Sequence, residues 1–418
     1  MARYDVIGAG LSGLAAALRL SAAGHEVTIH EAAGHAGGRC RSFHDDRLGL
    51  EIDNGNHLLL SGNRAAMAFL DEIGASDALM QGDHAAFPFV DFADDSRWTL
   101  RPNRGRLPWW IFSARRRVAG TTAGDYLAAL RLRGARPEAT VADCFDTTRP
   151  AFRRFWEPLT VAILNTRAED AAAALLWPVL VETFGQGEAA CRPCIARRGL
   201  SNAFVLPALA TLERRGATIR FGTRLRALDN DNGRVTHLRF TGEDVAVADG
   251  DGIVLAVPAA VAATLLPGLR TPRESRPIAN AHFRLDEAAP PMDGLPFLGI
   301  VGGTAEWLFI RDRLISVTVS AASHVIDMDS EELARLLWRD VARALGLDGE
   351  NIPPCRIVKE KRATFAQTPA EVARRPGAAT ALSNLVLAGD WTDTGLPATI
   401  EGSIRSGNRA AETVTQKA

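Results

Sequence analysis

The chain has 418 residues, of which 47% are hydrophobic and 23% are charged, and its formal net charge is −1. This composition predicts a globular protein of two or three domains, and the near balance of 48 basic and 49 acidic residues gives no sign of a nucleic-acid partner. Five cysteines are too few for a disulfide framework in so long a chain, so we expect a reducing, cytoplasmic compartment and no signal peptide.

The first forty residues carry the clearest pattern in the chain. An apolar run is followed by a cluster that contains Gly8, Gly10 and Gly13, then by a helical pattern, and then by a second apolar run that ends at Glu31. In such a strand–turn–helix unit the three glycines permit a tight turn, a close approach to a pyrophosphate and close packing of the helix. Glu31 stands at about the spacing expected of an acid that binds ribose hydroxyls. The pattern predicts a dinucleotide site.

A second glycine cluster, with Gly37, Gly38 and Arg39, follows this acid directly. Extra glycines and a guanidinium at this place suit a second approach to the same pyrophosphate. With this addition the N-terminal region resembles the FAD-binding start of the amine oxidase and phytoene desaturase superfamily. Nicotinamide dehydrogenases do not usually carry the second cluster.

A third strand pattern runs into Asp53, Gly55 and His57. In flavin oxidases of the superfamily, a segment of this kind passes the isoalloxazine ring, and Gly55 would allow a close approach of the backbone. His57 is the one side chain of this segment with an ordinary pKa near neutrality. The alternative is that Asp53 stabilises a turn and that His57 is a satisfied, partly buried histidine.

Residues 76–194 depart from the alternation of strands and helices. We expect an antiparallel pair over 87–92 and 98–100, followed by helices, which are predicted over residues 122–133, 141–145, 151–165 and 168–184. Between the two, segment 106–117 places Trp109, Trp110, Ile111 and Phe112 among arginines. Tryptophans favour membrane interfaces and arginines favour anionic headgroups, so the segment predicts contact with an anionic membrane surface. The alternative is that its aromatic residues pack into the core.

Three further features have structural interpretations. Cys191 and Cys194 form a CxxC motif, but no thioredoxin-like pattern and no second CxxC accompany it, so we expect neither a redox pair nor a zinc site. The uncharged run 252–269 is long enough to be weighed as a membrane span, but its prolines favour a buried strand and a short helix. Asn232 and Gly233 predict the turn of a β-hairpin.

The last fifty residues return to the cofactor. A buried strand ends in Gly389 and Asp390, and a final helix opens after Thr399 and Ile400. Asp390 can accept a hydrogen bond from a ribitol hydroxyl, and the start of the helix offers free N–H donors.

The whole chain resembles the hydroxysqualene dehydroxylases, which are also called squalene-associated FAD-dependent desaturases. The resemblance rests on four segments, which are residues 52–60, Trp156-Glu157-Pro158-Leu159, Leu164-Asn165-Thr166 and residues 387–402. It implies that FAD is bound, non-covalently, by Gly8, Gly10, Ser12, Gly13, Glu31, Gly37, Gly38, Arg39, Gly55, Asn56, Leu225, Gly389, Asp390, Thr399 and Ile400. Leu225 is included because the family holds the adenine with backbone at this strand end.

The resemblance implies a reductive dehydroxylation that turns hydroxysqualene into squalene for hopanoid synthesis, with an electron donor that the sequence does not identify. Hydroxide leaves poorly, so a general acid is required, and the candidates are His57, Asp393 and Glu401. Lys359 or Lys361 could instead hold a water near the flavin, as a lysine does in amine oxidases. Two other functions stay open, which are an oxidising desaturase or amine oxidase and a non-enzymatic prenyl-binding protein of the same fold.

We therefore expect an α/β fold in which a Rossmann-like FAD-binding domain is built from residues 1–75, 195–278 and 355–418. A discontinuous, mixed α+β substrate or cap domain would come from residues 76–194 and 279–354. The substrate that the resemblance implies is a lipophilic triterpene that resides in the bilayer, so we expect a cytoplasmic protein that is peripheral at the inner face of the membrane. No metal site is predicted.

Overall fold

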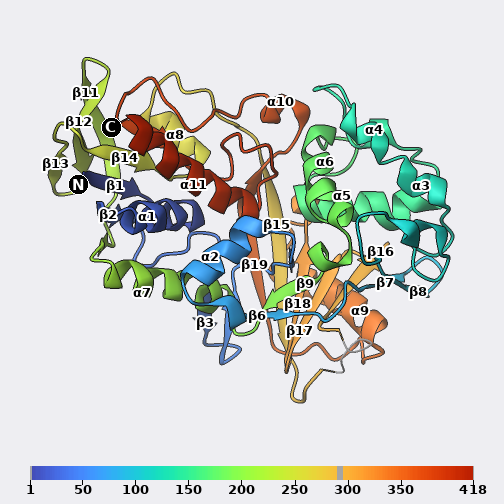
Figure 1. Ribbon diagram of the computed structural model, residues 1–418. Helices are drawn as coiled ribbons and strands as arrows, with labels where there is room; N and C mark the ends of the chain where they lie inside the picture. Colours follow the sequence, from blue (N-terminus) through green and yellow to red (C-terminus); the bar gives the residue numbers. More distant parts are fainter. Residues whose placement is uncertain (1, 290–294, 418) are drawn as a thin grey trace.

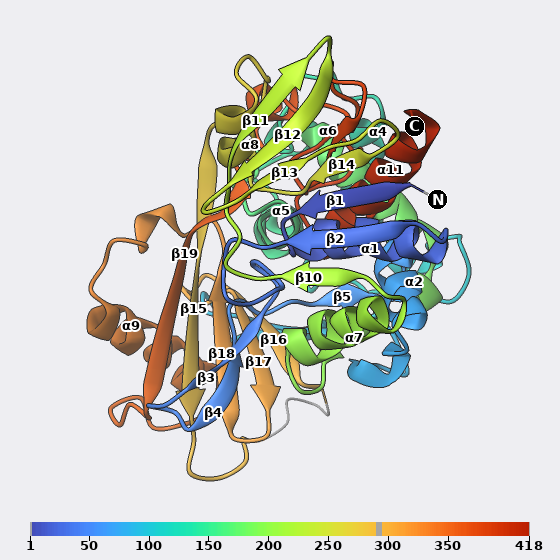
Figure 2. The same cartoon turned by 90° about the vertical axis from the view of Figure 1, so that its left-hand side faces the viewer.

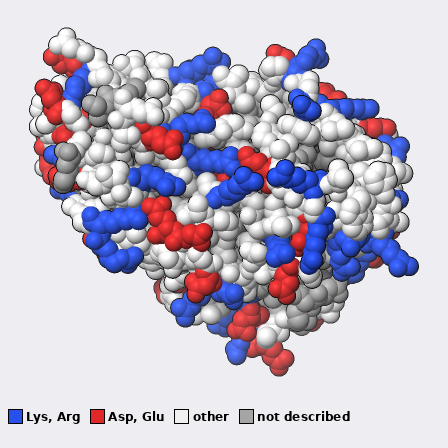
Figure 3. All heavy atoms as spheres, in the orientation of Figure 1, with Lys and Arg blue, Asp and Glu red and all other residues white. Residues whose placement is uncertain are grey.

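A computed structural model describes residues 2–289 and 295–417. Figure 1 shows a parallel sheet with its helices on one side of the molecule, and a larger sheet with a cluster of short helices on the other. Lys and Arg side chains are interspersed with Asp and Glu over the face drawn in Figure 3, in keeping with the near-zero net charge.

The N-terminal motif lies in a sheet of five parallel strands. Their order is β10 (Thr218–Arg220), β2 (Glu26–His30), β1 (Arg3–Ile7), β14 (Gly252–Leu255) and β20 (Leu385–Leu387). The helices α1 (Leu11–Ala22) and α11 (Ile400–Lys417) pack against each other beside it, closely enough that a Cβ atom at Gly407 would lie 2.2 Å from the carbonyl oxygen of Ser12. Because the strands are parallel, their carboxyl ends meet at one edge of the sheet.

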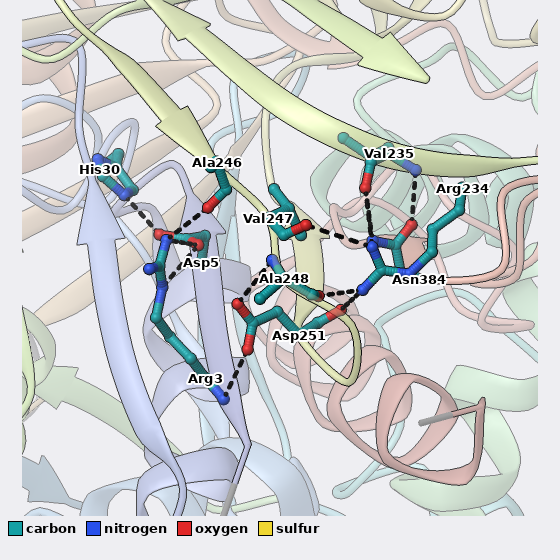
Figure 4. Close-up of polar contacts among 10 residues, drawn as sticks. All are labelled: Arg3, Asp5, His30, Arg234, Val235, Ala246, Val247, Ala248, Asp251 and Asn384. Atoms are coloured by element: carbon teal, nitrogen blue, oxygen red, sulfur yellow. Dashed lines mark hydrogen bonds and ion pairs between the residues drawn. The ribbon is translucent and has the colours of Figure 1, made fainter. Parts of the chain in front are cut away.

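A three-stranded antiparallel sheet adjoins the parallel one. It comprises β11 (Leu225–Asp231), β12 (Arg234–Phe240) and β13 (Asp244–Ala246), and the predicted hairpin turn is confirmed by positive φ angles at Asn232 and Gly233. Figure 4 shows how the two sheets are joined. The side chain of Asn384, which precedes β20, accepts the N–H of Val235 at 2.9 Å and donates to the carbonyl of Val235 at 3.0 Å. Within the parallel sheet, His30 of β2 pairs with the buried carboxylate of Asp5 of β1 at 2.9 Å.

The larger sheet has seven strands, in the order β19 (Cys355–Phe365), β15 (Ser275–Arg284), β18 (Leu314–Val319), β17 (Trp307–Arg311), β16 (Phe297–Val301), β7 (Phe87–Asp91) and β8 (Ser96–Leu100). The predicted antiparallel pair is confirmed as β7 and β8, and it joins the sheet through a parallel contact between β7 and β16. Alternate residues of β15 and β18 are apolar and pack against α9 (Ser330–Leu345). Figure 2 shows α9 on one side of this sheet and the parallel sheet on the other.

The helices between β8 and β9 are shorter than predicted. The elements that correspond to the predicted helices are α3 (Ala123–Leu127), α4 (Leu130–Arg133), η3 (Ala142–Cys144), the π-helical turn η4 (Phe152–Trp156), α5 (Glu157–Leu164) and α6 (Ala173–Glu182). The prediction of a helix from residue 168 was wrong in its start. The carbonyls of Ala168 and Ala171 accept hydrogen bonds from residues 142 and 141, and Ala172 donates to Gln367, so tertiary contacts occupy this backbone.

The remaining elements connect these layers. They are β3 (Ser42–Asp45), β4 (Leu50–Asp53), β5 (Leu59–Leu60), α2 (Arg64–Glu72), β6 (Leu79–Gln81), β9 (Pro193–Ala196), α7 (Leu206–Arg214), α8 (Ala259–Leu265) and α10 (Pro369–Val372). The uncharged run 252–269 folds as β14 and α8, as its prolines predicted. Within the described residues, no helix combines the length and the apolar character needed to cross a membrane.

Candidate active site

The glycines after β1 differ in what surrounds them. A Cβ atom at Gly8, where φ is +109°, would lie 2.4 Å from the carbonyl oxygen of Ala256, and one at Gly13 would lie 1.9 Å from the carbonyl oxygen of Gly8. A Cβ atom at Gly10 would meet nothing within 4 Å. Packing therefore requires glycine at the first and third positions, whereas the space at Gly10 is open to a ligand.

Helix α1 begins at this loop with free N–H groups. No side chain in the described part of the chain caps it, and its first turn has no acidic residue. Ser12 lies buried in that turn. A helix N-terminus without a cap carries a partial positive charge and unpaired donors, which is the environment that a phosphate favours.

Glu31 follows β2 at the same edge and lies beside the loop. Its carboxylate accepts the N–H groups of Ala9 and Ala33, each at 2.8 Å. Each oxygen keeps a second lone pair, so the carboxylate can still accept ribose hydroxyls. Leu225 begins β11 nearby, just after Thr223, whose N–H donates to the carbonyl of Glu31 at 2.9 Å.

The second glycine cluster closes over the first. Gly10 and Gly37 form a parallel β-bridge, and a Cβ atom at Gly38 would lie 3.5 Å from the Cα atom of Gly10. Arg39 then reaches across the site, where its guanidinium pairs with the buried carboxylate of Asp390 at 2.8 Å. Because of this carboxylate, the pKa of Arg39 lies above its usual value.

The C-terminal segment completes the edge. Gly389 has φ of +152°, and a Cβ atom there would lie 2.4 Å from the indole nitrogen of Trp391, so the turn that presents Asp390 requires glycine. Thr399 is the last residue before α11 and its hydroxyl accepts the N–H of Gly402 at 3.1 Å, while Ile400 is buried.

Together these residues fit a flavin dinucleotide. The open space at Gly10 and the uncapped helix suit a pyrophosphate, Glu31 suits the adenosine ribose, and Asp390 beside Arg39 suits the ribitol chain. Residues that are more than 350 positions apart in the chain thus meet at one edge of a sheet.

The segment 53–57 leads from this edge to the seven-stranded sheet. The Oδ1 atom of Asp53 accepts the Ser42 hydroxyl at 2.6 Å and the N–H of Leu200 at 2.8 Å, so this side chain connects distant segments of the chain and does not simply stabilise a local turn. Asn56 donates to the hydroxyl of Thr318 at 3.0 Å, and that hydroxyl donates to Asn280 at 2.9 Å.

His57 is half-buried and lines a small cavity with Asn56, Met80 and Phe309. Burial lowers its pKa below the ordinary value, the nearby Arg39 adds to this effect, and Asp53 opposes it. The imidazole is therefore mainly neutral at pH 7, which leaves it a weak proton donor.

The other two predicted acids have contacts that favour structural roles. Glu401 is buried, accepts the first N–H groups of α2 from Ala65 and Ala66 at 3.0 and 2.8 Å, and pairs with Arg405 at 2.8 Å. Asp393 is exposed and accepts the N–H of Gly395 at 3.1 Å. Their assignment as acids stays a prediction, and these contacts do not support it.

The contacts of Lys359 and Lys361 do not support the alternative in which one of them holds a water near the flavin. Lys359 lies opposite Ala279, a residue of the face that packs against α9, and its Nζ atom donates to the carbonyl of Met328. Lys361 pairs with Asp327 at 2.9 Å. Both side chains therefore point away from the face on which Asn280 contacts Asn56.

The sequence gave no reason to single out Glu306, which lies between β16 and β17. Its Oε2 atom accepts the N–H of Ser320 at 2.7 Å. The neighbouring Ala321 donates to the side chain of Asn165 at 2.6 Å. The Leu164-Asn165-Thr166 motif was the one sequence feature near this site, and nothing in the motif indicates that residue 306 lies close to it.

None of the five cysteines forms a disulfide bond. All five are free and buried, and burial raises the pKa of Cys191 to about 12 and of Cys194 to about 11. No group of metal ligands occurs among residues 2–289 and 295–417. The absence of a redox pair and of a zinc site at the CxxC motif stays a prediction.

Segment 106–117 divides its aromatic residues between core and surface. Trp110 and Ile111 are 4% and 3% exposed and belong to the aromatic core, whereas Trp109 and Phe112 are 50% and 68% exposed. The expectation that all four side chains can enter a membrane is wrong for the buried Trp110 and Ile111, and membrane contact through Trp109 and Phe112 stays a prediction. Arg117 is also engaged, since it donates to the carbonyls of residues 111 and 121.

Comparison with known proteins agrees with this geometry. Residues 11–415 match the model of the flavin containing amine oxidoreductases. The chain belongs to this family. It is 50% identical to a hydroxysqualene dehydroxylase of Rhodopseudomonas palustris, over 98% of this chain and 97% of the relative, and 48% identical to one of Sinorhizobium fredii, over 97% of each. An oxidoreductase from Methanosarcina mazei has the same fold, with a TM-score of 0.73 at 16% identity, over 98% of this chain and all of the other.

Within the flavin containing amine oxidoreductases, the chain is therefore a member of the hydroxysqualene dehydroxylase group. Membership confirms the predicted α/β fold, the flavin cofactor and the oxidoreductase class. The individual site residues and the boundaries between the two domains stay predictions.

Proposed function

We propose that the protein is an FAD-dependent oxidoreductase that converts hydroxysqualene into squalene by reductive dehydroxylation. The observation that carries this proposal is the 50% identity, over nearly the whole chain, to a relative that is named for this reaction. The cofactor edge supports it, because its open glycine loop and its two acids suit a dinucleotide.

The proposed FAD ligands are the residues predicted from the sequence, with the backbone at Gly10 and Gly38 near the pyrophosphate and with Glu31 and Asp390 on the ribose and ribitol hydroxyls. The bound, reduced flavin supplies a hydride, so that FADH2 and the allylic alcohol give FAD, squalene and water. The protein must therefore exclude bulk water, orient the alcohol and deliver one proton to its oxygen.

The apolar cap suits a long hydrocarbon. Its aromatic cluster is flanked by partly buried apolar side chains, among them Leu159, Ile163, Trp177 and Trp307. We propose that the triterpene lies along these side chains, beside the carboxylates of Glu157 and Glu306. Removal of its apolar surface from water would favour binding by about 25 cal/mol for each Å² buried.

The proposed route of the substrate is the membrane surface, at the inner face of the cytoplasmic membrane. Leu107, Trp109 and Phe112 are exposed on segment 106–117, and Leu127 and Leu130 are exposed on the adjoining helices α3 and α4. Arg106 and Arg115 are exposed beside the aromatic residues and could pair with lipid phosphates.

The reaction can be tested directly. When reduced holoenzyme is mixed anaerobically with hydroxysqualene, its flavin should be reoxidised, and one squalene should form for each flavin that is reoxidised. Because hydrogen on the flavin N5 atom exchanges with solvent, reaction in heavy water should place one deuterium at the former carbinol carbon or its allylic partner. Squalene without this label would exclude flavin hydride as its source.

The same experiment separates the alternatives. An oxidising desaturase or amine oxidase would bleach in its oxidised state on addition of a hydrocarbon or an amine and would ignore hydroxysqualene. A prenyl-binding protein of the same fold would bind the lipid without any change of the flavin spectrum.

A further inference from the structure

Glu306 is a carboxylate that the sequence did not identify, and it lies beside Ser320 and the loop of Asn165. It precedes β17, and its backbone N–H donates to the carbonyl of Thr318 at 3.2 Å. Ala305 packs into the core around α9, while the charged groups that act on Glu306 are Arg167 and Glu157. The Glu306 side chain therefore points away from α9, toward the loop after α5.

Two other segments, those of Asn56 and Asn165, are connected to Glu306 through strand β18 and the residues that follow it. On one side, Thr318 bonds to Glu306 through its carbonyl and to Asn56 through its hydroxyl. On the other side, Asn165 accepts the N–H of Ala321, next to the Ser320 that donates to Glu306.

The same loop also reaches the start of α11. The side chain of Gln367 donates to the carbonyl of Leu164 at 2.7 Å and accepts the N–H of Ala398 at 2.9 Å, just before Thr399. The Leu164-Asn165-Thr166 motif thus links the flavin segment at the beginning of α11 to the position of Glu306.

The electrostatic surroundings of Glu306 favour a protonated carboxyl group. No described residue forms an ion pair with it, and Glu157, which faces it from α5, is itself paired with Arg167 at 3.1 Å. Burial raises the pKa of Glu306 to about 7, with Glu157 adding to the rise and the Ser320 N–H and Arg167 opposing it. Part of the side chain remains accessible, so a proton can be exchanged there.

We propose that Glu306 is the catalytic acid that protonates the departing hydroxyl group of the allylic alcohol. This inference rests on the proposed function. The proton passes from the carboxylic acid to the hydroxyl oxygen, the carbon–oxygen bond breaks with its electron pair on oxygen, and water leaves. The carbon then takes the hydride that the proposed function supplies, and Glu306 is reprotonated from solvent.

The competing acids are less suited to this step. His57 is mainly neutral at pH 7, Glu401 is committed to α2 and Arg405, and Asp393 lies at the surface. Glu306 combines a carboxyl group that forms no ion pair with any described residue, a chain of contacts to Asn56 and a polar neighbour, Ser320, that positions it.

The test compares three variants by single-turnover reoxidation of the reduced holoenzyme with hydroxysqualene. Glu306→Gln keeps an acceptor for the Ser320 N–H but has no acidic proton, and we expect it to slow the step by about 10²–10⁴-fold. Glu306→Asp should recover part of the rate. Glu331→Gln, on the exposed side of α9, should react at the wild-type rate. The wild-type rate should be constant at low pH and fall above a pH of about 7, and Glu306→Gln should lose this dependence.

A second measurement does not depend on turnover. In the pH-difference infrared spectrum of oxidised holoenzyme, a carboxylic acid band should titrate near pH 7 in the wild type and be missing from Glu306→Gln. A Glu306→Gln enzyme with the wild-type rate and pH profile, or with the infrared band intact, would overturn the assignment of Glu306 as the acid but leave the proposed function standing. A wild-type enzyme that forms no squalene would overturn the proposed function and this inference together.

Discussion

At the carboxyl edge of the parallel sheet, the proposed cofactor contacts come mainly from backbone and from residues that are close in sequence. Gly8, Gly10 and Gly13 lie within one turn and helix start, and Glu31 follows the next strand. On the polar face of the seven-stranded sheet, the comparable contacts come from side chains on several elements. Glu306, Ser320 and Asn165 belong to separate parts of the chain and meet only when the sheet is assembled.

This difference shows how each site responds to change. The cofactor edge depends on the absence of side chains, so an added methyl group damages it. The proposed site around Glu306 depends on particular side chains in an otherwise apolar layer, so we expect the removal of one group to change the chemistry while the flavin stays bound.

The largest expected effect is that of Gly13→Val. The new Cβ atom would overlap the carbonyl oxygen of Gly8, which is backbone and cannot move aside, so we expect a cost at or above about 3 kcal/mol and loss of the flavoprotein. Thermal unfolding and flavin absorbance after purification measure this. Gly10→Ala is the matched control, because its Cβ has room: it should fold with a normal Tm yet bind flavin more weakly. A yellow, stable Gly13→Val protein would contradict the proposed packing.

The next largest effect is expected at segment 106–117, on membrane binding alone. Changing both Trp109 and Phe112 to Ser should weaken binding to anionic liposomes by about 1–2 kcal/mol for each aromatic residue, since both are already partly buried in the free protein. Sedimentation with liposomes at several salt concentrations measures this, and flavin content should not change. Trp110→Ser should instead lower the Tm, because Trp110 is in the core. Equal liposome binding by the double variant and the wild type would show that this surface does not meet lipid.

A smaller effect is expected at the cofactor edge. Glu31→Ala removes a charged acceptor for the ribose, with an expected loss of about 1.5–3 kcal/mol of FAD affinity. Glu31→Gln keeps one acceptor oxygen and should lose less. Titration of the flavin-free protein with FAD gives both affinities. Unchanged affinity in Glu31→Ala would mean that the carboxylate serves only the N–H groups of Ala9 and Ala33.

The smallest expected effect distinguishes His57 from Glu306 as the proton donor of the reaction. Burial lowers the pKa of His57, so the neutral form predominates at pH 7 and little donor function is lost in His57→Ala. We expect turnover to fall by less than about tenfold, or about 1.4 kcal/mol, with the pH profile intact. Single-turnover rates across pH decide this. A loss of about 10²-fold or more, together with the loss of the pH dependence, would return the acid role to His57.

The sequence by itself determined the strand–turn–helix unit, the acid at Glu31 and the Gly-Asp strand end, because each depends on neighbours within one or two elements. The close packing at Gly8 and Gly13 could be predicted for the same reason, since a turn into a helix leaves no room for a side chain there.

Only the tertiary structure decided which side chains share a face. It turned Lys359 toward α9, committed Glu401 to the first turn of α2, divided Trp109 from Trp110, and brought Glu306 beside Ser320 and the loop of Asn165. These positions depend on strand register and on irregular turns between distant segments. A shift of one residue in a strand reverses the face of every side chain, and no local pattern records that choice.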